Sequence, residues 1–414
     1  MASEETSKGP PPMPDARPTK SKPGALSAAA PVAANRLMDI PPSGTMAVGR
    51  RVRNLRAAGV DVVHLGAGSP DPAPACLERP LTLRSDMNVT GDPAGDAQLR
   101  AAITKKLFDD QGLTYDPNTQ IVVTVGAKQA LYAALLALIE PGDEVAILDP
   151  AWVTYGPAVQ IADGIPRTFA LDRGNGFRLD PAALEAVIGP RTRVVVMNTP
   201  HNPTGRVFTV DELESVAAVA RAHGLWVISD ESFDKFVFDG RRHVGMASLN
   251  DMYERTIVLQ SFSKSYGFIG GRVGYMAGPS ALAGQVARFN EQVLTCVSLF
   301  MQSVALAALG EEPSWTSVLR RQYQAKRDFA VEAVRGLKGF ECDVPEGTFY
   351  VFADISSFGQ NSEEFAVRVL DETRVAVTPG RAFGAGGEGY VRFNLAASMD
   401  IIRDGFNRLG KAYG

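Results

Sequence analysis

The stretch "RVVVMNTPHNPTGRVFTVDELESVAAVARAHGLWVISD" (residues 193–230) holds two short apolar runs separated by a helical segment. The runs "RVVVMN" (193–198) and "LWVISD" (225–230) are rich in Val, Ile and Leu, which is typical of strands buried on both faces. Between them, Thr209 and Glu212 have the spacing of a capping box, and a glycine follows the expected helix end. This order predicts two parallel strands joined by a helix.

The same alternation continues on both sides of this stretch. The run "IVVTV" (121–125) reads as a strand, and the segment after it carries leucines at spacings of three and four, as a helix does. The run "TIVLQS" (256–261) is a further strand of the buried type. The pattern predicts an α/β fold with a mostly parallel sheet, covered by helices on both faces.

The two ends of the chain differ from this middle part. Residues 1–34 are rich in proline and poor in large apolar side chains, so we expect a disordered tail there, the alternative being a lid that orders on binding. Residues 35–75 and 312–414 are expected to form a small α+β domain built from both termini. Residues 76–311 are expected to form a large domain around the sheet.

Composition excludes several classes of function. The 414 residues carry a formal net charge of −4, which does not suggest a nucleic-acid or membrane-surface partner. The three cysteines, Cys76, Cys296 and Cys342, lack the spacing of a disulfide framework or a zinc site. The histidines also lack the spacing of metal ligands; they are His64, His201, His223 and His243. We expect no metal. The sequence has no apolar signal core or membrane-spanning run, which predicts a cytoplasmic protein.

Polar residues follow several of the expected strands where each strand ends. Gly126, Asn198, Asn202, Asp230 and the segment from Ser261 to Lys264 all occupy such positions. In open α/β sheets, ligands bind beyond the carboxyl ends of the strands. Convergence of these residues at one edge predicts a binding site there.

These motifs together resemble the aspartate-aminotransferase family, the class I and II aminotransferases of fold type I, which depend on pyridoxal phosphate. The resemblance covers about residues 35–414 and rests on "LGAGSPD" (65–71), "VGAKQAL" (125–131), "DPAWVTY" (149–155), "NTPHNPTG" (198–205), "SDESF" (229–233), "SFSKSYGFIGGR" (261–272) and "YVRFNLAAS" (390–398). It implies a large domain around a seven-stranded sheet, which binds the cofactor and corresponds to residues 76–311, and a small terminal domain. It also implies a homodimer with active sites at the subunit interface.

The resemblance assigns the chemistry to three residues. Lys264 is expected to form the Schiff base with the cofactor and to carry a proton during the reaction, which requires a lowered pKa or an imine bond. Asp230 is expected to pair with the protonated pyridine nitrogen and keep the ring electron-withdrawing. Asn202 is expected to donate to the phenolic oxygen of the ring and to contact the substrate.

The remaining site residues are expected to bind the phosphate, the ring or the substrate. A helix start and basic or hydroxyl side chains suit a phosphate, and an arginine fork suits a carboxylate. Trp152 is expected to stack on the ring. The phosphate residues are Gly126, Ala127, Lys128, Ser261, Ser263 and Arg272, and the substrate-binding residues are Arg392, with the backbone around Gly68, and Arg381.

Three positions depart from the family pattern. Phe233 occupies the place of a tyrosine that donates to the phenolic oxygen of the cofactor, so Asn202 would hold this oxygen alone or with water. In "NVTGDPAGDAQLR" (88–100), Thr90 falls nearest to a tyrosine that reaches the phosphate of the neighbouring subunit. Arg381 replaces a small residue near the expected substrate entrance.

The departures leave the reaction open between two chemistries. The first is transfer of an amino group from an L-amino acid to a 2-oxo acid. The second is elimination, replacement or ring formation on an amino acid such as S-adenosylmethionine, at the same cofactor. A non-enzymatic sensor domain of a transcription factor is disfavoured, because residues 1–34 are too short for a DNA-binding domain.

Overall fold

The computed structural model describes residues 37–38, 40, 42–67, 70 and 85–414. Ile40–Gly414 forms one compact unit. The expected tail at 1–34, together with Gly68 and Cys76, lies outside the described residues.

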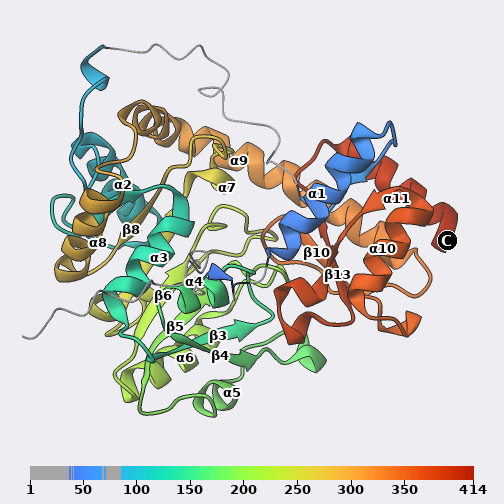
Figure 1. Cartoon of the computed structure of the whole chain (residues 1–414), viewed down its shortest axis with the longest axis horizontal. Helices are drawn as coiled ribbons and strands as arrows, with labels where there is room; N and C mark the ends of the chain where they lie inside the picture. The colour runs from blue at the N-terminus through green and yellow to red at the C-terminus, as the bar shows by residue number, and fades with distance from the viewer. Residues whose placement is uncertain (1–36, 39, 41, 68–69, 71–84) are drawn as a thin grey trace, which may run out of the picture. The chain divides into compact units, whose positions relative to one another are not determined.

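A seven-stranded sheet organises the middle of the chain, with the strand order β2-β8-β7-β6-β5-β3-β4. Only β8 runs antiparallel to its neighbours, so the expected mostly parallel sheet is confirmed. Figure 1 labels most of these strands, with helices α3 and α4 beside them. The strands are β2 (Ile121–Thr124), β3 (Glu144–Asp149), β4 (Ile165–Ala170), β5 (Thr192–Asn198), β6 (Trp226–Asp230), β7 (Thr256–Ser261) and β8 (Gly274–Ala277).

Apolar side chains project from both faces of this sheet, and helices cover both faces. In β2, Val122 packs into one apolar cluster, while Ile121 and Val123 pack into another. The partner strand β8 divides in the same way, with Met276 in the first cluster and Tyr275 in the second. This alternation follows from the two-residue period of a strand. The covering helices are α2 (Ala97–Gln111), α3 (Gly126–Leu138), α4 (Tyr155–Ile161), α5 (Pro181–Glu185), α6 (Val210–Ala222) and α8 (Ser280–Val293).

The βαβ unit predicted from the sequence forms as expected. Thr209 Oγ1 accepts from the backbone of Glu212, and the Glu212 carboxylate accepts from the backbone of Thr209, so the capping box is complete. Strands β5 and β6 then pair in parallel, with Asn198 opposite Asp230 at their carboxyl ends. The capping box and the register together bring these two polar residues to one edge of the sheet.

A second sheet comes mainly from the end of the chain and has the order β12-β13-β10-β9. Its apolar cluster also includes Val63 and Leu65 from the beginning of the described chain. Helix α9 runs without a break through residue 312, where the small domain was expected to begin, and the division into domains stays a prediction. The remaining elements are α1 (Gly44–Ala57), β1 (Val63–His64), α7 (Phe262–Ser265), α9 (Leu299–Arg335), β9 (Glu341–Cys342), β10 (Tyr350–Asp354), α10 (Ser362–Thr373), β11 (Val375–Ala376), β12 (Thr378–Pro379), β13 (Tyr390–Asn394) and α11 (Met399–Tyr413).

The described residues include neither a membrane-spanning helix nor a metal-binding cluster. None of the helices there is long and apolar enough to cross a membrane. Within the same ranges, no group of three or more His, Cys, Asp or Glu side chains is placed to hold a metal ion.

Gly274 in β8 has no room for a side chain. A Cβ atom there would lie 2.6 Å from the carbonyl oxygen of Gln260 and 2.7 Å from the backbone nitrogen of Ala127, at the start of α3. We predict that Gly274→Ala lowers the free energy of unfolding by about 1–3 kcal/mol, the usual cost of overpacking. Gly284→Ala is the control, since nothing lies within 4 Å of its Cβ position in helix α8. Equal denaturation midpoints for the two variants would contradict this account.

Candidate active site

A cleft of about 250 Å³ opens at the carboxyl ends of the parallel strands. Most of the residues singled out from the sequence line it, although they come from separate segments of the chain. These are Ala127, Lys128, Trp152, Asn202, Asp230, Phe233, Ser261, Ser263, Lys264, Arg272 and Arg392. The cleft therefore gathers the strand-end residues as the sheet topology predicts.

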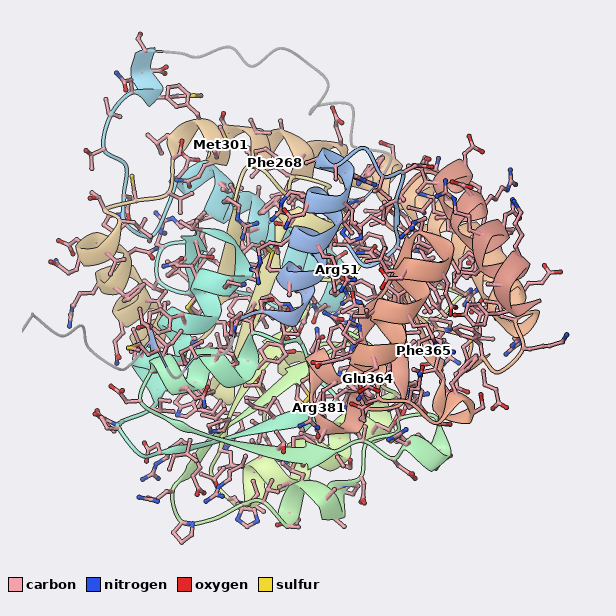
Figure 2. The ribbon with its side chains drawn as sticks, turned by 45° about the vertical axis from the view of Figure 1, so that its right-hand side comes forward. Arg51, Phe268, Met301, Glu364, Phe365 and Arg381 are labelled. Atoms are coloured by element: carbon pink, nitrogen blue, oxygen red, sulfur yellow. The ribbon has the colours of Figure 1, made fainter. Side chains whose placement is uncertain are left out.

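Three expected site residues are not among those that line the cleft. Gly126 lies just behind it, where an added Cβ would stand 2.6 Å from Arg272 Nη2. Gly68 belongs to the undescribed residues. Arg381 is exposed and lines a separate cavity of about 890 Å³, so the structure does not bring it together with Lys264. Figure 2 shows Arg381 on the orange-red C-terminal part and Arg51 on the blue helix α1, both of which line the larger cavity.

Lys264 lies on the one-turn helix α7, directly after strand β7. Its Nζ atom stands 6.0 Å from the ring centre of Phe233 and 5.5 Å from that of Phe349. Removal from water, and then the positive charges of Arg392 and Arg272, lower the pKa of Lys264 to about 8, against the opposing effect of Asp230. About a tenth of this amine is therefore neutral and nucleophilic at pH 7, far more than for an ordinary lysine.

The backbone around Lys264 is held from two sides. Ser265 Oγ donates to Asp234 Oδ1 at 2.9 Å, and Trp315 Nε1 donates to the Ser265 carbonyl at 2.8 Å. Asp234 also accepts from the buried amine of Lys106 at 2.6 Å. The Lys106 charge contributes to a low pKa of the Asp234 carboxyl, although burial opposes it, so this carboxyl stays ionised and keeps its acceptor role.

Asp230 presents a buried carboxylate at the end of β6. Tyr155 Oη donates to its Oδ2 at 2.7 Å, and both the backbone and the hydroxyl of Ser232 donate to its Oδ1, at 3.1 and 2.6 Å. Burial raises the pKa of Asp230, and the three hydrogen bonds oppose that rise. No lysine, arginine or histidine of the described chain lies within ion-pair distance of it. A protonated ring nitrogen would supply the missing positive partner.

The other end of the cleft suits an anion. Helix α3 begins at Gly126, and no side chain caps its first turn, so its backbone N–H groups are available to a ligand. Arg272 Nη1 donates to Ser263 Oγ at 3.0 Å. Burial, and then the positive charge of Arg272, lower the pKa of Lys128, so two basic side chains lie near each other here. A phosphate dianion matches this arrangement.

Arg392 lies buried between two aromatic rings, 4.0 Å from the ring centre of Tyr350 and 4.6 Å from that of Phe383. Its Nη1 donates to Asn202 Oδ1 at 2.8 Å, and its Nη2 donates to the carbonyl of Gly66 at 3.2 Å. Its buried Nε has no hydrogen-bond partner among the described residues. The fixed guanidinium therefore keeps an unused donor for a carboxylate.

Several residues of the cleft were missed by the sequence analysis. Ser232 could have been found, because it follows Asp230 by two residues, and an Asp side chain often accepts a hydrogen bond from the backbone two residues later. Tyr155 and Tyr350 lie in apolar runs and look like ordinary core aromatics in the sequence. The full set of additional lining residues is Thr45, Ala67, Tyr155, Asn198, Ser232, Ile269, Tyr350 and Asn394, of which only Asn198 had been noted as a strand-end residue.

Comparisons with known proteins agree with the fold and the cleft. The family model for aminotransferase class I and II matches residues 60–402. The chain is 37% identical over 367 residues to an aspartate aminotransferase of Pyrococcus abyssi, covering 87% of this chain and 94% of that protein. It is 36% identical over 361 residues to aromatic-amino-acid aminotransferase 2 of Thermococcus litoralis, covering 86% and 92%. The solved aspartate aminotransferase of Thermus thermophilus with maleate has a TM-score of 0.85 and 31% identity, covering 92% of this chain and 100% of that one.

The fold and the cleft thus define a pyridoxal-phosphate enzyme of fold type I. The chain belongs to the class I and II aminotransferases and is an aminotransferase that acts on amino acids. The resemblance seen in the sequence is confirmed, and the alternative of elimination or ring formation is not favoured. The cofactor is pyridoxal 5′-phosphate. A buried carboxylate without a cation, an amine of lowered pKa and an anion site match its ring nitrogen, aldehyde and phosphate.

The lowered pKa of Lys264 predicts how the cofactor-free enzyme takes up pyridoxal phosphate. The uptake rate should rise about tenfold per pH unit below pH 8 and level off above it, because the neutral amine is the reactive form. Arg392→Gln removes a positive charge that lowers this pKa, so the midpoint should move to higher pH. Arg403→Gln, on helix α11 away from the cleft, is the control. A midpoint that Arg392→Gln leaves in place would refute the electrostatic account.

Proposed function

We propose that the enzyme transfers the amino group of a dicarboxylic amino acid to a 2-oxo acid, with Arg392 binding the α-carboxylate and Lys128 the distal carboxylate. The observation that carries this proposal is the position of Lys128. Its Nζ atom lies 5.3 Å from the ring centre of Trp152, and it lines the same cleft as Arg392. No carboxylate of the described chain lies within ion-pair distance of this amine. Such a cation favours an anionic ligand.

The names of relatives support an acidic substrate. One relative is named an aspartate aminotransferase, and the Thermus thermophilus enzyme of that name was solved with maleate, which carries two carboxylates. The Thermococcus litoralis relative is named for aromatic amino acids. The family resemblance alone therefore does not decide which side chain the amino-acid substrate carries. The uncompensated charge of Lys128 favours the dicarboxylic substrate.

In this proposal, the bound cofactor withdraws electrons from the α-carbon of the substrate, and the residues of the chain do the rest. Lys264 anchors the cofactor covalently and, when released, its Nζ moves the proton at the α-carbon. The Asp230 carboxylate pairs with the protonated ring nitrogen and stabilises its positive charge. Trp152 stacks on the ring, and Asn202 donates to the phenolic oxygen, since its own Oδ1 is occupied by Arg392.

The phosphate lies, in the same proposal, at the start of helix α3. The backbone of Gly126, Ala127 and Lys128 would donate to it, together with Arg272 and the hydroxyls of Ser261 and Ser263. Arg381 is proposed only as a residue of the outer entrance, because it lines the larger cavity. This cavity shares Trp152 with the cleft.

A homodimer and a cytoplasmic location are also proposed. Two exposed valines, Val89 and Val293, each leave 61% of their surface uncovered. Their segments lie together, since the backbone of Gly91 donates to Cys296 Sγ at 3.2 Å. This partly apolar surface supports an interface between two copies. Thr90 lies in the same exposed segment, where a contact to the neighbouring subunit was expected.

Lys264→Ala tests the covalent role. We predict that it lowers the rate of amino-group transfer by about a thousandfold or more, because no other positioned base replaces the amine. The circular-dichroism spectrum and thermal midpoint should stay near those of the unchanged enzyme, since the alanine fits the same helix turn. Lys105→Ala, an exposed lysine on α2, is the control. Retained transfer activity in Lys264→Ala would overturn the assignment.

Lys128→Gln tests the substrate. We predict that it lowers kcat/KM for aspartate roughly tenfold or more, while kcat/KM for alanine changes much less, because only aspartate loses a charge partner. Lys105→Gln serves as the matched control. The dissociation constant of the cofactor must be measured in parallel. A loss of cofactor affinity with an unchanged preference for aspartate would place Lys128 at the phosphate and contradict the dicarboxylate proposal.

A further inference from the structure

Tyr350 is a buried residue whose hydroxyl has no assigned task. It lies at the start of strand β10, is 4% exposed, and lines the cleft. No residue in the described ranges forms a hydrogen bond with its hydroxyl. Buried polar groups usually have partners, so an unused hydroxyl at a ligand cleft points to the ligand.

The sheet register sets the direction of the Tyr350 side chain. Strands β10 and β13 are antiparallel, and Tyr350 lies opposite Asn394, two residues from Arg392. Residues two apart share a face of a strand, so Tyr350 and Arg392 lie on one face, which agrees with the 4.0 Å from the Arg392 guanidinium to the Tyr350 ring centre. The stacked guanidinium restricts the ring.

Tyr350 acts as a donor in this position. Burial raises the pKa of its phenol, and the charge of Arg392 only partly opposes that rise. The hydroxyl therefore stays protonated at neutral pH. It needs an acceptor, and an anionic oxygen is the strongest kind.

Phe233, which neighbours Tyr350, provides no hydrogen-bond donor to the cleft. The rings of Phe233 and Tyr350 lie edge to face with their centres 5.6 Å apart, and Phe233 carries no hydroxyl. Lys264 Nζ lies 6.0 Å from the ring centre of Phe233. Asn202 is the other polar side chain beside Arg392, and with its Oδ1 accepting from Arg392 it offers one donor group, its amide nitrogen. This wall of the cleft has few donors for an oxygen of the cofactor ring.

We propose that the Tyr350 hydroxyl donates a hydrogen bond to the anionic phenolic oxygen of the bound cofactor, in place of the donor that Phe233 lacks. Tyr350 would thus be a cofactor-binding residue on strand β10, whereas Phe233 lies in the turn after β6. The proposal rests on the binding of pyridoxal phosphate at Lys264 described above. It does not depend on which amino acid is the substrate.

Tyr350→Phe in the cofactor-loaded enzyme, without substrate, tests the proposal. The donor stabilises the anionic oxygen, so its loss should raise the pH at which the visible absorbance of the bound cofactor changes, by about half a unit to one unit. Adding Phe233→Tyr to this variant restores a hydroxyl from the adjacent ring and should move the midpoint back. The dissociation constant of the cofactor should rise severalfold in Tyr350→Phe and recover in the double variant.

Tyr115→Phe is the matched control, because Tyr115 is also buried and its hydroxyl also has no partner, yet it lies outside the cleft. It should leave the midpoint unchanged. An unchanged midpoint in Tyr350→Phe, with weaker binding of maleate, would place the hydroxyl on the substrate and overturn the proposal. A lower thermal midpoint alone would indicate packing only and would also overturn it. Neither result depends on the Lys128 experiment, so the two proposals fail separately.

Discussion

The parallel pairing of β5, β6 and β7 is the constraint on which the site depends. Parallel strands end at the same edge of a sheet, and here the register sets Asn198 opposite Asp230 and Asp230 opposite Leu259. Two residues beyond Leu259, strand β7 ends at Ser261, and the chain turns at once into the helix that carries Lys264. The carboxylate and the amine therefore lie at the two sides of one cleft because of strand pairing, before any side-chain contact is made.

Charge is the second organising feature. In addition to burial, the positive charges of Arg392 and Arg272 lower the pKa of Lys264. Arg392 lies on strand β13, and Arg272 lies in the loop after helix α7. The same two cations are the expected partners of the substrate carboxylate and the phosphate. Anions bound at these positions would weaken both effects on Lys264, so ligand binding and the basicity of this amine are coupled.

Much of this arrangement could be predicted from the sequence because it depends on local patterns. The strands, the Thr209 capping box and the residues at strand ends all follow from short-range periodicity, and the family resemblance supplied most of the roles. Tyr155 and Tyr350 could not be predicted in this way, because the residues that they contact, Asp230 and Arg392, lie at distant positions in the chain. Nothing near Tyr155 in the sequence signals its bond to Asp230. Arg381 was expected near the substrate entrance, and its sequence neighbours do not reveal that it lines the outer cavity and not the cleft, so its role stays a prediction.

The double support of Ser265 has a consequence for motion. Asp234 and Trp315 hold the residue after Lys264 from two directions, one through its hydroxyl and one through its carbonyl. In the proposed mechanism, the Lys264 amine leaves the cofactor and returns while these two hydrogen bonds hold the main chain beneath it. The movement is then confined to rotations about the carbon–carbon bonds of one lysine side chain and needs no rearrangement of a loop. The hydrogen bonds at Ser265 thus limit the motion needed for the reaction to the Lys264 side chain.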